Sequence, residues 1–230
     1  MNIEHFTPSI VPVEQVADLW KENDVLISII DLNDYPTPGA DHLDKVEKAH
    51  LSTLQTEYFK KRYIASRMVL KYLSGILKGR SWASIVTCKD EHGRVHVCDH
   101  NDLHVCISYT ENIVALVISK IDIGIDIEVI KSRSVTSISK SINKTSPERS
   151  SSVNGYDFLV MWTLKEAYCK LSNETMFSNL ARTLDMSDVY HSSYVVDNKY
   201  VLSLVTKSYL YKVNIVRLPK IEFDKKSPLN

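Results

Sequence analysis

The strongest constraint on the fold of this chain is a stretch in which apolar residues alternate with acidic residues and glycine, Ile121-Asp-Ile-Gly-Ile-Asp-Ile-Glu-Val129. Because successive side chains of a strand point to opposite faces, the pattern predicts a β-strand with its isoleucines on one face. Asp126 and Glu128 share the other face, where carboxylates two residues apart lie about 7 Å from each other. One divalent cation can bridge that distance, and Gly124 leaves room beside it. A strand with one solvated face is the plainer interpretation of the same pattern.

A second informative segment is the helical pattern of Tyr156–Leu171, in which Trp162, Glu166 and Lys170 recur at every fourth position. Residues four apart share a helix face, and Glu166 precedes Lys170 in the order that favours an ion pair. A surface ion pair is the plain interpretation. The alternative adds Glu166 to the two carboxylates of the alternating strand as a third oxygen ligand. Three carboxylates without histidine or thiolate suit Mg²⁺ rather than zinc.

Basic residues and histidines are concentrated in two further segments. The predicted helical region Glu57–Arg80 carries seven basic residues and one acid. Most such residues lie on a solvated helix face, but a ligand with several phosphates would use a few of them. A histidine also occurs at every fourth position from His92 to His104. Gly93 and the β-rich pattern predict a strand–turn–strand there, in which this spacing does not converge on a zinc ion.

The composition narrows the possible functions. The chain of 230 residues carries 28 basic and 28 acidic residues, and this zero net charge argues against a bulk nucleic-acid binder. The chain has only six glycines, and its sequence contains no glycine-rich phosphate-binding motif. The start of the chain has no apolar signal segment, and no stretch approaches the ~18 apolar residues of a membrane span. The four cysteines form no CxxC motif. We therefore expect a cytoplasmic protein that acts without a membrane.

The order of the expected elements predicts an α+β chain built as two similar halves. Helices followed by antiparallel strands occur twice, in residues 1–119 and 120–230, with the join near Ser119–Ile121. We interpret the serine-rich segment Lys131–Gly155 as a mobile loop and residues 219–230 as a frayed tail.

Two motifs occur in order along the chain, Gly124-Ile-Asp-Ile-Glu128 and Trp162-Thr-Leu-Lys-Glu-Ala-Tyr-Cys-Lys170. Together they resemble GIDIE … WxxKExxxK, the paired signature of Sfp-type 4′-phosphopantetheinyl transferases. Either motif alone is weak, but both in this order are a specific signal. The resemblance covers roughly residues 24–172 and includes Asp44-Lys-Val-Glu-Lys48, the helix that Arg62 leads, Gly93-Arg-Val95 in place of GKP, and Cys106-Ile-Ser-Tyr-Thr110 in place of N-[LI]-SH-[ST].

The resemblance implies a function and a set of site residues. It implies a monomeric α+β pseudo-dimer with coenzyme A in the cleft between its halves, nucleotide contacts in the N-terminal half, and metal and catalytic residues in the C-terminal half. It implies transfer of 4′-phosphopantetheine to a serine of an acyl- or peptidyl-carrier protein of fatty-acid, polyketide or non-ribosomal peptide synthesis, with release of 3′,5′-ADP. Asp126, Glu128 and Glu166 are the implied Mg²⁺ ligands. Glu166 and Lys170 are the implied catalytic residues, and Glu148 is a weaker candidate for the base. The implied coenzyme A contacts are Lys45, Lys48, Arg62, Arg94, Ser108, Tyr109, Lys165 and Lys170.

Some positions depart from the pattern of the family. Tyr109 stands where the family has a histidine, and a phenol donates a hydrogen bond to phosphate but carries no positive charge. Cys106 replaces an asparagine and Arg94-Val95 replaces Lys-Pro, whereas the three carboxylates are unchanged. Two other functions stay open: a non-catalytic carrier-protein or nucleotide binder on the same fold, and a metal-dependent hydrolase with the same carboxylates. The identity of the reaction product distinguishes these possibilities.

Overall fold

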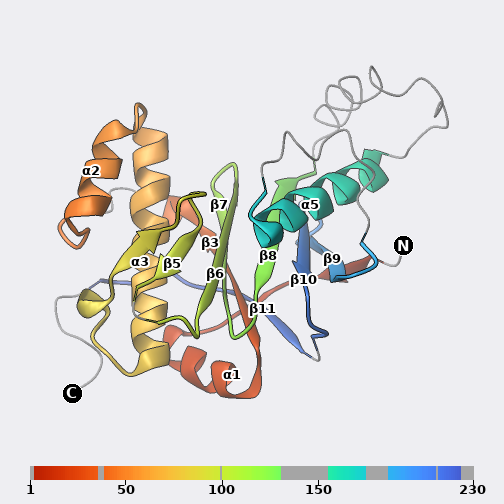
Figure 1. Cartoon of the computed structure of the whole chain (residues 1–230), viewed down its shortest axis with the longest axis horizontal. Helices are drawn as coiled ribbons and strands as arrows, with labels where there is room; N and C mark the ends of the chain where they lie inside the picture. The colour runs from red at the N-terminus through yellow and green to blue at the C-terminus, as the bar shows by residue number, and fades with distance from the viewer. Residues whose placement is uncertain are drawn as a thin grey trace. The chain divides into compact units, whose positions relative to one another are not determined.

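The computed structural model describes residues 3–35, 39–98, 100–130, 155–174, 186–210 and 212–223. They form several β-sheets and a few helices (Figure 1), so the predicted α+β class is confirmed. The chain divides into two compact units. The first unit comprises Met1–Pro8, Ser108–Glu111 and Asp122–Leu210, and the second comprises Ser9–Ile107, Asn112–Ile121 and Tyr211–Asn230.

The first unit consists of a four-stranded sheet and the helix α5 (Gly155–Ser172). Its strands lie in the order β1 (Glu4–Phe6), β9 (Tyr190–Val196), β10 (Tyr200–Thr206) and β8 (Ile123–Val129). β10 is antiparallel to both of its neighbours, and β1 is parallel to β9. Helix α5 lies against β8 and β10 (Figure 1). It buries an apolar stripe on the sheet that includes Leu159, Val160, Leu164, Leu171, Val201 and Val205.

Gly124 sets how closely α5 approaches β8. A Cβ atom at this position would lie 1.9 Å from the carbonyl oxygen of Ala167 and 2.8 Å from the amide nitrogen of Leu171. Any side chain there would push the helix off the strand, because both of these atoms belong to the helix backbone. The sequence suggested that Gly124 leaves open space beside the carboxylates. That prediction is wrong, because α5 fills the space beside Gly124. The close contact brings the polar residues of α5 next to those of β8.

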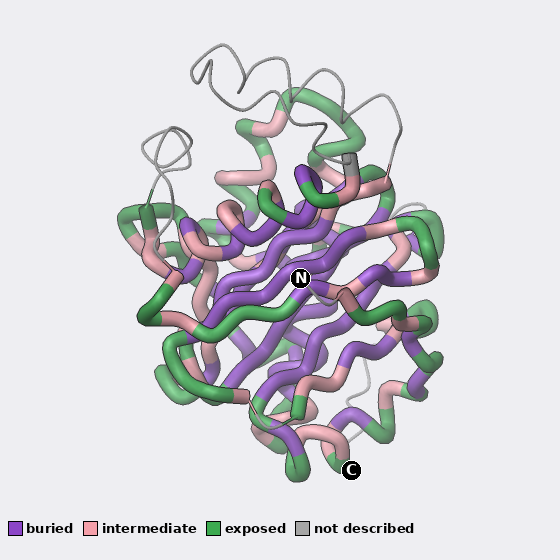
Figure 2. Tube along the Cα trace, turned by 90° about the vertical axis from the view of Figure 1, so that its right-hand side faces the viewer, coloured by how far each residue is buried: buried purple, intermediate pink, exposed green. Residues whose placement is uncertain are grey.

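The second unit is built on a five-stranded sheet in the order β2 (Ser9–Ile10), β11 (Val213–Arg217), β3 (Val25–Asp31), β7 (Ile113–Ser119) and β6 (His104–Thr110). The last residues of β6 group with the first unit. Strands of the molecule are buried along much of their length (Figure 2). The other elements are the helices α1 (Val16–Glu22), α2 (Lys45–Thr53) and α3 (Glu57–Lys78), the 3-10 helices η1 (Val13–Gln15), η2 (Leu32–Asp34) and η3 (Trp82–Ser84), and the antiparallel pair β4 (Thr87–Lys89) and β5 (Val95–Val97).

Helix α3 has a defined start and end and a largely buried middle. The hydroxyl of Thr56 caps the first turn by accepting from the amide of Phe59, and Gly79 ends the helix in the left-handed conformation at φ 60°. Arg67 and Lys71 are only 4% and 3% exposed. For these two residues the interpretation as a solvated basic face is wrong, because the helix packs among other elements on more than one side.

The two units differ from the predicted halves at both ends of the chain. One boundary falls at Ile121, close to the predicted join. However, β1 pairs with β9 and β11 pairs with β3, so each chain end joins the unit formed mainly by the other half. Local sequence patterns do not encode such long-range pairings. The similarity of two halves and a cleft between them remain predictions.

Part of the expected frayed tail is packed. The amide of Ile221 donates to the hydroxyl of Tyr35 at 3.1 Å, and Ile221 is 4% exposed. The ring of Phe223 lies 5.8 Å from that of Trp82 and 5.9 Å from that of Tyr72. Residues 224–230 lie outside the described residues. So do residues 131–154 of the segment Lys131–Gly155, expected to be a mobile loop or poorly ordered bridge, whereas Gly155 begins α5.

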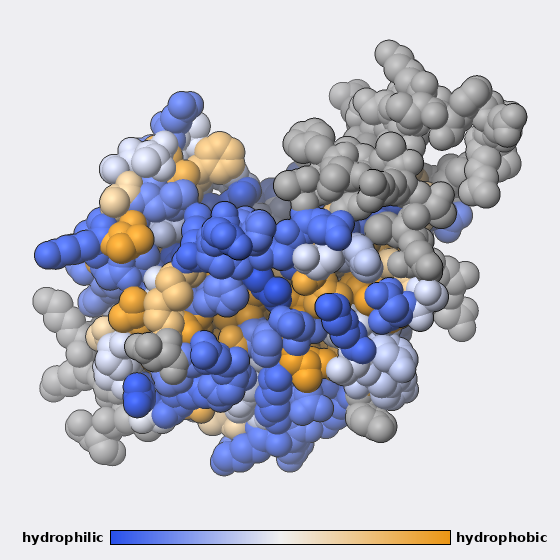
Figure 3. Space-filling model, viewed as in Figure 1, coloured by the Kyte–Doolittle hydropathy of each residue, from blue (hydrophilic) through white to orange (hydrophobic). Residues whose placement is uncertain are grey.

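The visible surface is mostly hydrophilic, with smaller hydrophobic patches between (Figure 3). The exposed apolar residues of the protein include Val46 on α2 and Phe59 at the start of α3. Among the described helices, none combines the length and the apolar character needed to cross a membrane.

Candidate active site

Asp126 lies in β8 and is buried, with 2% of its surface exposed. Its Oδ1 accepts a hydrogen bond from the hydroxyl of Ser108 at 2.6 Å and one from Lys170 at 2.8 Å. Its Oδ2 is buried and has no hydrogen-bond partner among the described residues. The interpretation of this face as solvated is therefore wrong at Asp126. A buried carboxylate oxygen without a partner is costly unless something else binds it.

Glu128 lies two residues further along β8 and is partly buried. The hydroxyl of Thr110 donates to its Oε2 at 3.2 Å, and the side chain of Trp162 on α5 also hydrogen-bonds to it. Burial is the main cause that raises the pKa of Glu128, and the negative charge of Asp126 raises it further. Thr110, Lys170 and Trp162 offset part of that rise.

Glu166 reaches the same region from α5. Burial raises its pKa to about 7, with further contributions from the charges of Asp126 and Glu128, while Lys170 acts in the opposite direction. Neighbouring acids therefore disfavour the charged forms of Glu128 and Glu166, as expected beside an excess of negative charge. That Glu166 joins the two carboxylates of the strand as a metal ligand remains a prediction.

The helix spacing suggests a surface ion pair between Lys170 and Glu166, but the Lys170 amine contacts residues of two strands. Its amine donates to Asp126 and, at 2.9 Å, to the hydroxyl of Ser108. About a third of the Lys170 side chain stays exposed, at 29%, whereas that of Asp126 is 3% exposed. Tyr109 on β6 and Lys165 on α5 belong to the same unit and are each partly buried.

The donor chemistry of this region fits Mg²⁺. Carboxylate oxygens are the ligands that Mg²⁺ prefers, and the buried Oδ2 of Asp126 is an acceptor without a partner. Yet the described residues contain no group of three or more His, Cys, Asp or Glu side chains already gathered to hold a metal ion. Lys170 instead contacts one oxygen of Asp126. Mg²⁺ binding by Asp126, Glu128 and Glu166 is accordingly a proposal.

In the histidine-rich segment, His96 contacts Asp90 at 3.1 Å.

The predicted coenzyme A contacts of the second unit lie on two of its helices and in the turn before β5. Lys45 and Lys48 are exposed in the first turn of α2, where Lys48 donates to the carbonyl of Asp41 at 3.5 Å. Arg62 lies on α3 with its guanidinium 5.3 Å from the centre of the Phe59 ring. Arg94 precedes β5, and its amide donates to the side chain of Asp90 at 2.8 Å.

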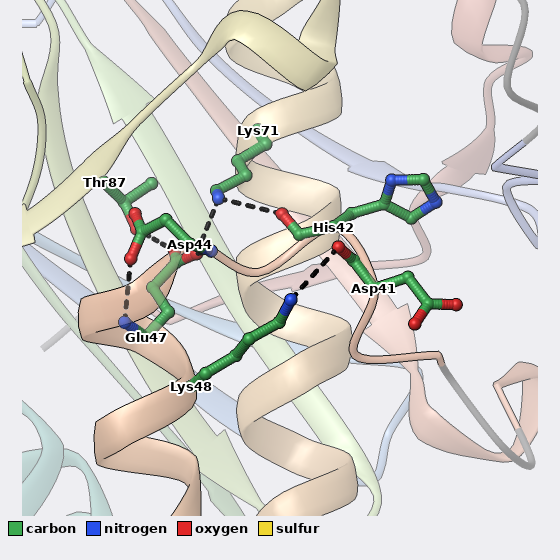
Figure 4. A network of polar contacts seen from close by, with 7 residues as sticks. All are labelled: Asp41, His42, Asp44, Glu47, Lys48, Lys71 and Thr87. Carbon is green, nitrogen blue, oxygen red and sulfur yellow. Dashed lines mark hydrogen bonds and ion pairs between the residues drawn. The ribbon is translucent and has the colours of Figure 1, made fainter.

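A buried polar network fixes the helix that carries Lys45 and Lys48 (Figure 4). Glu47 pairs with Lys71 of α3 at 2.6 Å and accepts a hydrogen bond from Thr87 of β4. Glu47 also forms a capping box with Asp44 at the start of α2. The network ties α2 to α3 and β4, so the backbone beside both exposed lysines is held in place.

The sequence interpretation missed a second group of cations, around Tyr63. The guanidinium of Arg67 lies 4.9 Å and the amine of Lys89 lies 6.0 Å from the centre of the Tyr63 ring. Lys89 is 3.2 Å from His50, and burial followed by the charges of Lys89 and Arg67 lowers the pKa of His50. The Nη1 atom of Arg67 is buried and has no hydrogen-bond partner within the described part of the chain. The basic character of Glu57–Arg80 was a sequence signal for Arg67, whereas Lys89 and His50 lie outside that segment and had no sequence signal.

Comparison with known proteins agrees with the motifs. Residues 122–210 match the family model of the 4′-phosphopantetheinyl transferase superfamily. This segment contains β8, α5, β9 and β10, and therefore Asp126, Glu128, Glu166 and Lys170. The resemblance seen in the sequence is confirmed over this segment, which is similar to a superfamily of transferases; residues 1–121 and 211–230 lie outside the match. No curated protein matches the chain.

Proposed function

We propose that this protein transfers 4′-phosphopantetheine from coenzyme A to a serine of an acyl- or peptidyl-carrier protein, and releases 3′,5′-ADP. The observation that carries the proposal is the buried carboxylate–lysine cluster on the segment that matches the superfamily. In this proposal the serine oxygen bonds to the phosphorus of the phosphopantetheine, and the bond from that phosphorus to the oxygen of 3′,5′-ADP breaks.

The residues of the first unit take distinct parts in this reaction. Asp126, Glu128 and Glu166 would hold Mg²⁺, which when bound neutralises negative charge on the pyrophosphate. Lys170 and Lys165 supply positive charge to the leaving phosphate. Glu166 is the proposed base that accepts the proton of the serine hydroxyl. The alternative base, Glu148, lies outside the described residues.

The residues of the second unit bind the nucleotide phosphates in this proposal. Four of these residues stand at positions that match the family's motifs: Lys45, Lys48, Arg62 and Arg94. Arg67 and Lys89, which lie near Arg62 and Arg94 in the sequence, add positive charge. The buried Arg67 guanidinium, which lacks a carboxylate partner among the described residues, supports a polyanionic ligand. Tyr109, in the first unit, completes the proposed coenzyme A contacts. The Ser108 hydroxyl, which the family motif also suggested as a contact, is instead engaged by Asp126, Lys170 and the amide of Ile127.

Intact-mass spectrometry tests the proposal. The protein is incubated with coenzyme A, Mg²⁺ and a panel of apo carrier proteins, and a matched sample contains EDTA. A carrier that gains one phosphopantetheine, together with 3′,5′-ADP in equal amount, supports the transferase. Binding of coenzyme A without modification of any carrier would identify a non-catalytic binder, and hydrolysed coenzyme A without a modified carrier would identify a hydrolase.

A further inference from the structure

Strand β8 is the edge strand of its sheet, and side-chain hydroxyls cover its outer side. β10 pairs with one side of β8. On the other side, the amides of Ile127 and Val129 donate to hydroxyl groups of β6 instead of to a neighbouring strand. Edge strands usually leave such amides to solvent or to a covering element. Here the cover consists of two hydroxyls, each of which also contacts a carboxylate.

The first hydroxyl belongs to Ser108, which is 3% exposed. It accepts from the amide of Ile127 at 3.3 Å and from the amine of Lys170 at 2.9 Å. Its single hydrogen is directed to Oδ1 of Asp126 at 2.6 Å. A hydroxyl has one donor and two acceptor sites, so all three are used. Ser108 thereby fixes which oxygen of Asp126 is engaged and leaves Oδ2 for a ligand.

The second hydroxyl belongs to Thr110 and repeats the arrangement one step along the strand. It accepts from the amide of Val129 at 3.2 Å and donates to Oε2 of Glu128 at 3.2 Å. In both cases the hydroxyl bridges a carboxylate and the amide of the residue that follows it. The two hydroxyls are two residues apart on β6, as the two carboxylates are on β8, so the spacing of one strand matches that of the other.

We propose that Thr110 and Ser108 are positioning residues that set the orientation of Glu128 and Asp126 for Mg²⁺. This inference rests on the proposed function. Hydrogen-bonded partners of ligating carboxylates restrict their rotation, and loss of such a partner weakens metal binding by roughly 10–100-fold. Thr110 gives the cleaner test of the two, because Ser108 also contacts the proposed catalytic Lys170.

The test compares three variants by calorimetric titration with Mn²⁺ as the metal probe. Thr110→Val keeps the shape of the side chain and removes the hydroxyl, whereas Thr110→Ser keeps the hydroxyl. Thr163→Val is the matched control, because the buried hydroxyl of Thr163 on α5 contacts Ser203 at 2.6 Å and the carbonyl of Val160 at 3.1 Å. Urea unfolding measures the change in stability of each variant.

The expected result separates positioning from stability. Both valine variants lose stability, but only Thr110→Val binds Mn²⁺ about tenfold more weakly or worse, and Thr110→Ser stays close to wild type. Equal Mn²⁺ affinity in wild type and Thr110→Val, or an equal loss in Thr163→Val, overturns the positioning role. A wild type that binds no Mn²⁺ overturns it as well. If wild type modifies no carrier but Thr110→Val still weakens Mn²⁺ binding, the transferase proposal is refuted and the positioning role is supported.

Discussion

Among the described residues, two buried acids each pair with a lysine, one in each unit, and they differ in how completely the acid is satisfied. In the second unit, Glu47 and Lys71 are 2.6 Å apart and both side chains are 3% exposed. One oxygen of Glu47 accepts from Thr87, and the other accepts from Lys71 and from the amide of Asp44. In this pair every charge has its partner.

The pair in the first unit is incomplete. Asp126 shares one oxygen between Ser108 and Lys170, while the other oxygen is buried without a partner among the described residues. Glu128 and Glu166 add negative charge beside it. A closed network of this kind stabilises a fold, whereas an open one with excess charge is typical of a binding or catalytic site. The contrast supports a structural role for Glu47 and is consistent with the proposed ligand-binding role of Asp126.

The largest expected effect is on stability in the second unit. Glu47→Gln leaves the buried ammonium group of Lys71 without its counter-charge, and we expect the free energy of unfolding to fall by about 3–5 kcal/mol. Urea unfolding measures this change. The double variant Glu47→Met with Lys71→Met removes both charges and should recover much of the loss. A Glu47→Gln protein as stable as wild type would contradict the structural role of Glu47.

Asp126→Asn should change stability little and reduce activity strongly. Its lysine is partly exposed and can be solvated, and the substitution removes repulsion from Glu128 and Glu166. The free energy of unfolding should therefore change by about 1 kcal/mol or less. Carrier modification should fall by about a hundredfold or more, because a proposed metal ligand is lost. Circular dichroism and the mass-based transfer assay measure the two effects. If Asp126→Asn lost as much stability as Glu47→Gln and kept full activity, the roles would be reversed.

The basic residues of the second unit provide a smaller effect. Arg62→Ala should raise the KM for coenzyme A about tenfold or more, because a charge-assisted contact to phosphate contributes roughly 1.5–3 kcal/mol. Lys78→Ala is the matched control: Lys78 lies at the end of the same helix and pairs with Asp102. Steady-state kinetics at varied coenzyme A measure both. Equal changes in the two variants would indicate general electrostatic attraction instead of a specific contact.

Local periodicity was enough to predict the elements that form the candidate site. The alternation around Asp126 predicted β8, and the helical pattern of Tyr156–Leu171 predicted α5, which carries Glu166 and Lys170. Burial was not predictable, because the groups that cover Asp126 come from a separate strand that contributes Ser108. The sequence also suggested a solvated Lys71, whose buried partner is Glu47 on another helix. Such partners depend on tertiary contacts, which a local pattern does not contain.

The smallest effect concerns Tyr109, which lies between the two hydroxyls that contact the carboxylates. Successive side chains of a strand point to opposite faces, so Tyr109 faces away from the side of β6 that Ser108 and Thr110 present to β8. Tyr109→His should therefore leave Mn²⁺ affinity unchanged and alter only the binding of coenzyme A. At pH 6 most of an ordinary imidazole is protonated and at pH 8 little of it is, so the added positive charge acts mainly at pH 6.

We expect Tyr109→His to lower the KM for coenzyme A roughly two- to fivefold at pH 6 and hardly at all at pH 8, the size of an exposed ionic contact. Titration of coenzyme A into both proteins at both pH values measures the change. Weaker binding by Tyr109→His at every pH would mean that the phenol ring itself contacts the ligand, for example by stacking on the adenine. A weaker Mn²⁺ affinity would show that Tyr109 shares the carboxylate side of the strand, and would contradict the division of β6 into a metal-orienting face and a nucleotide-binding face.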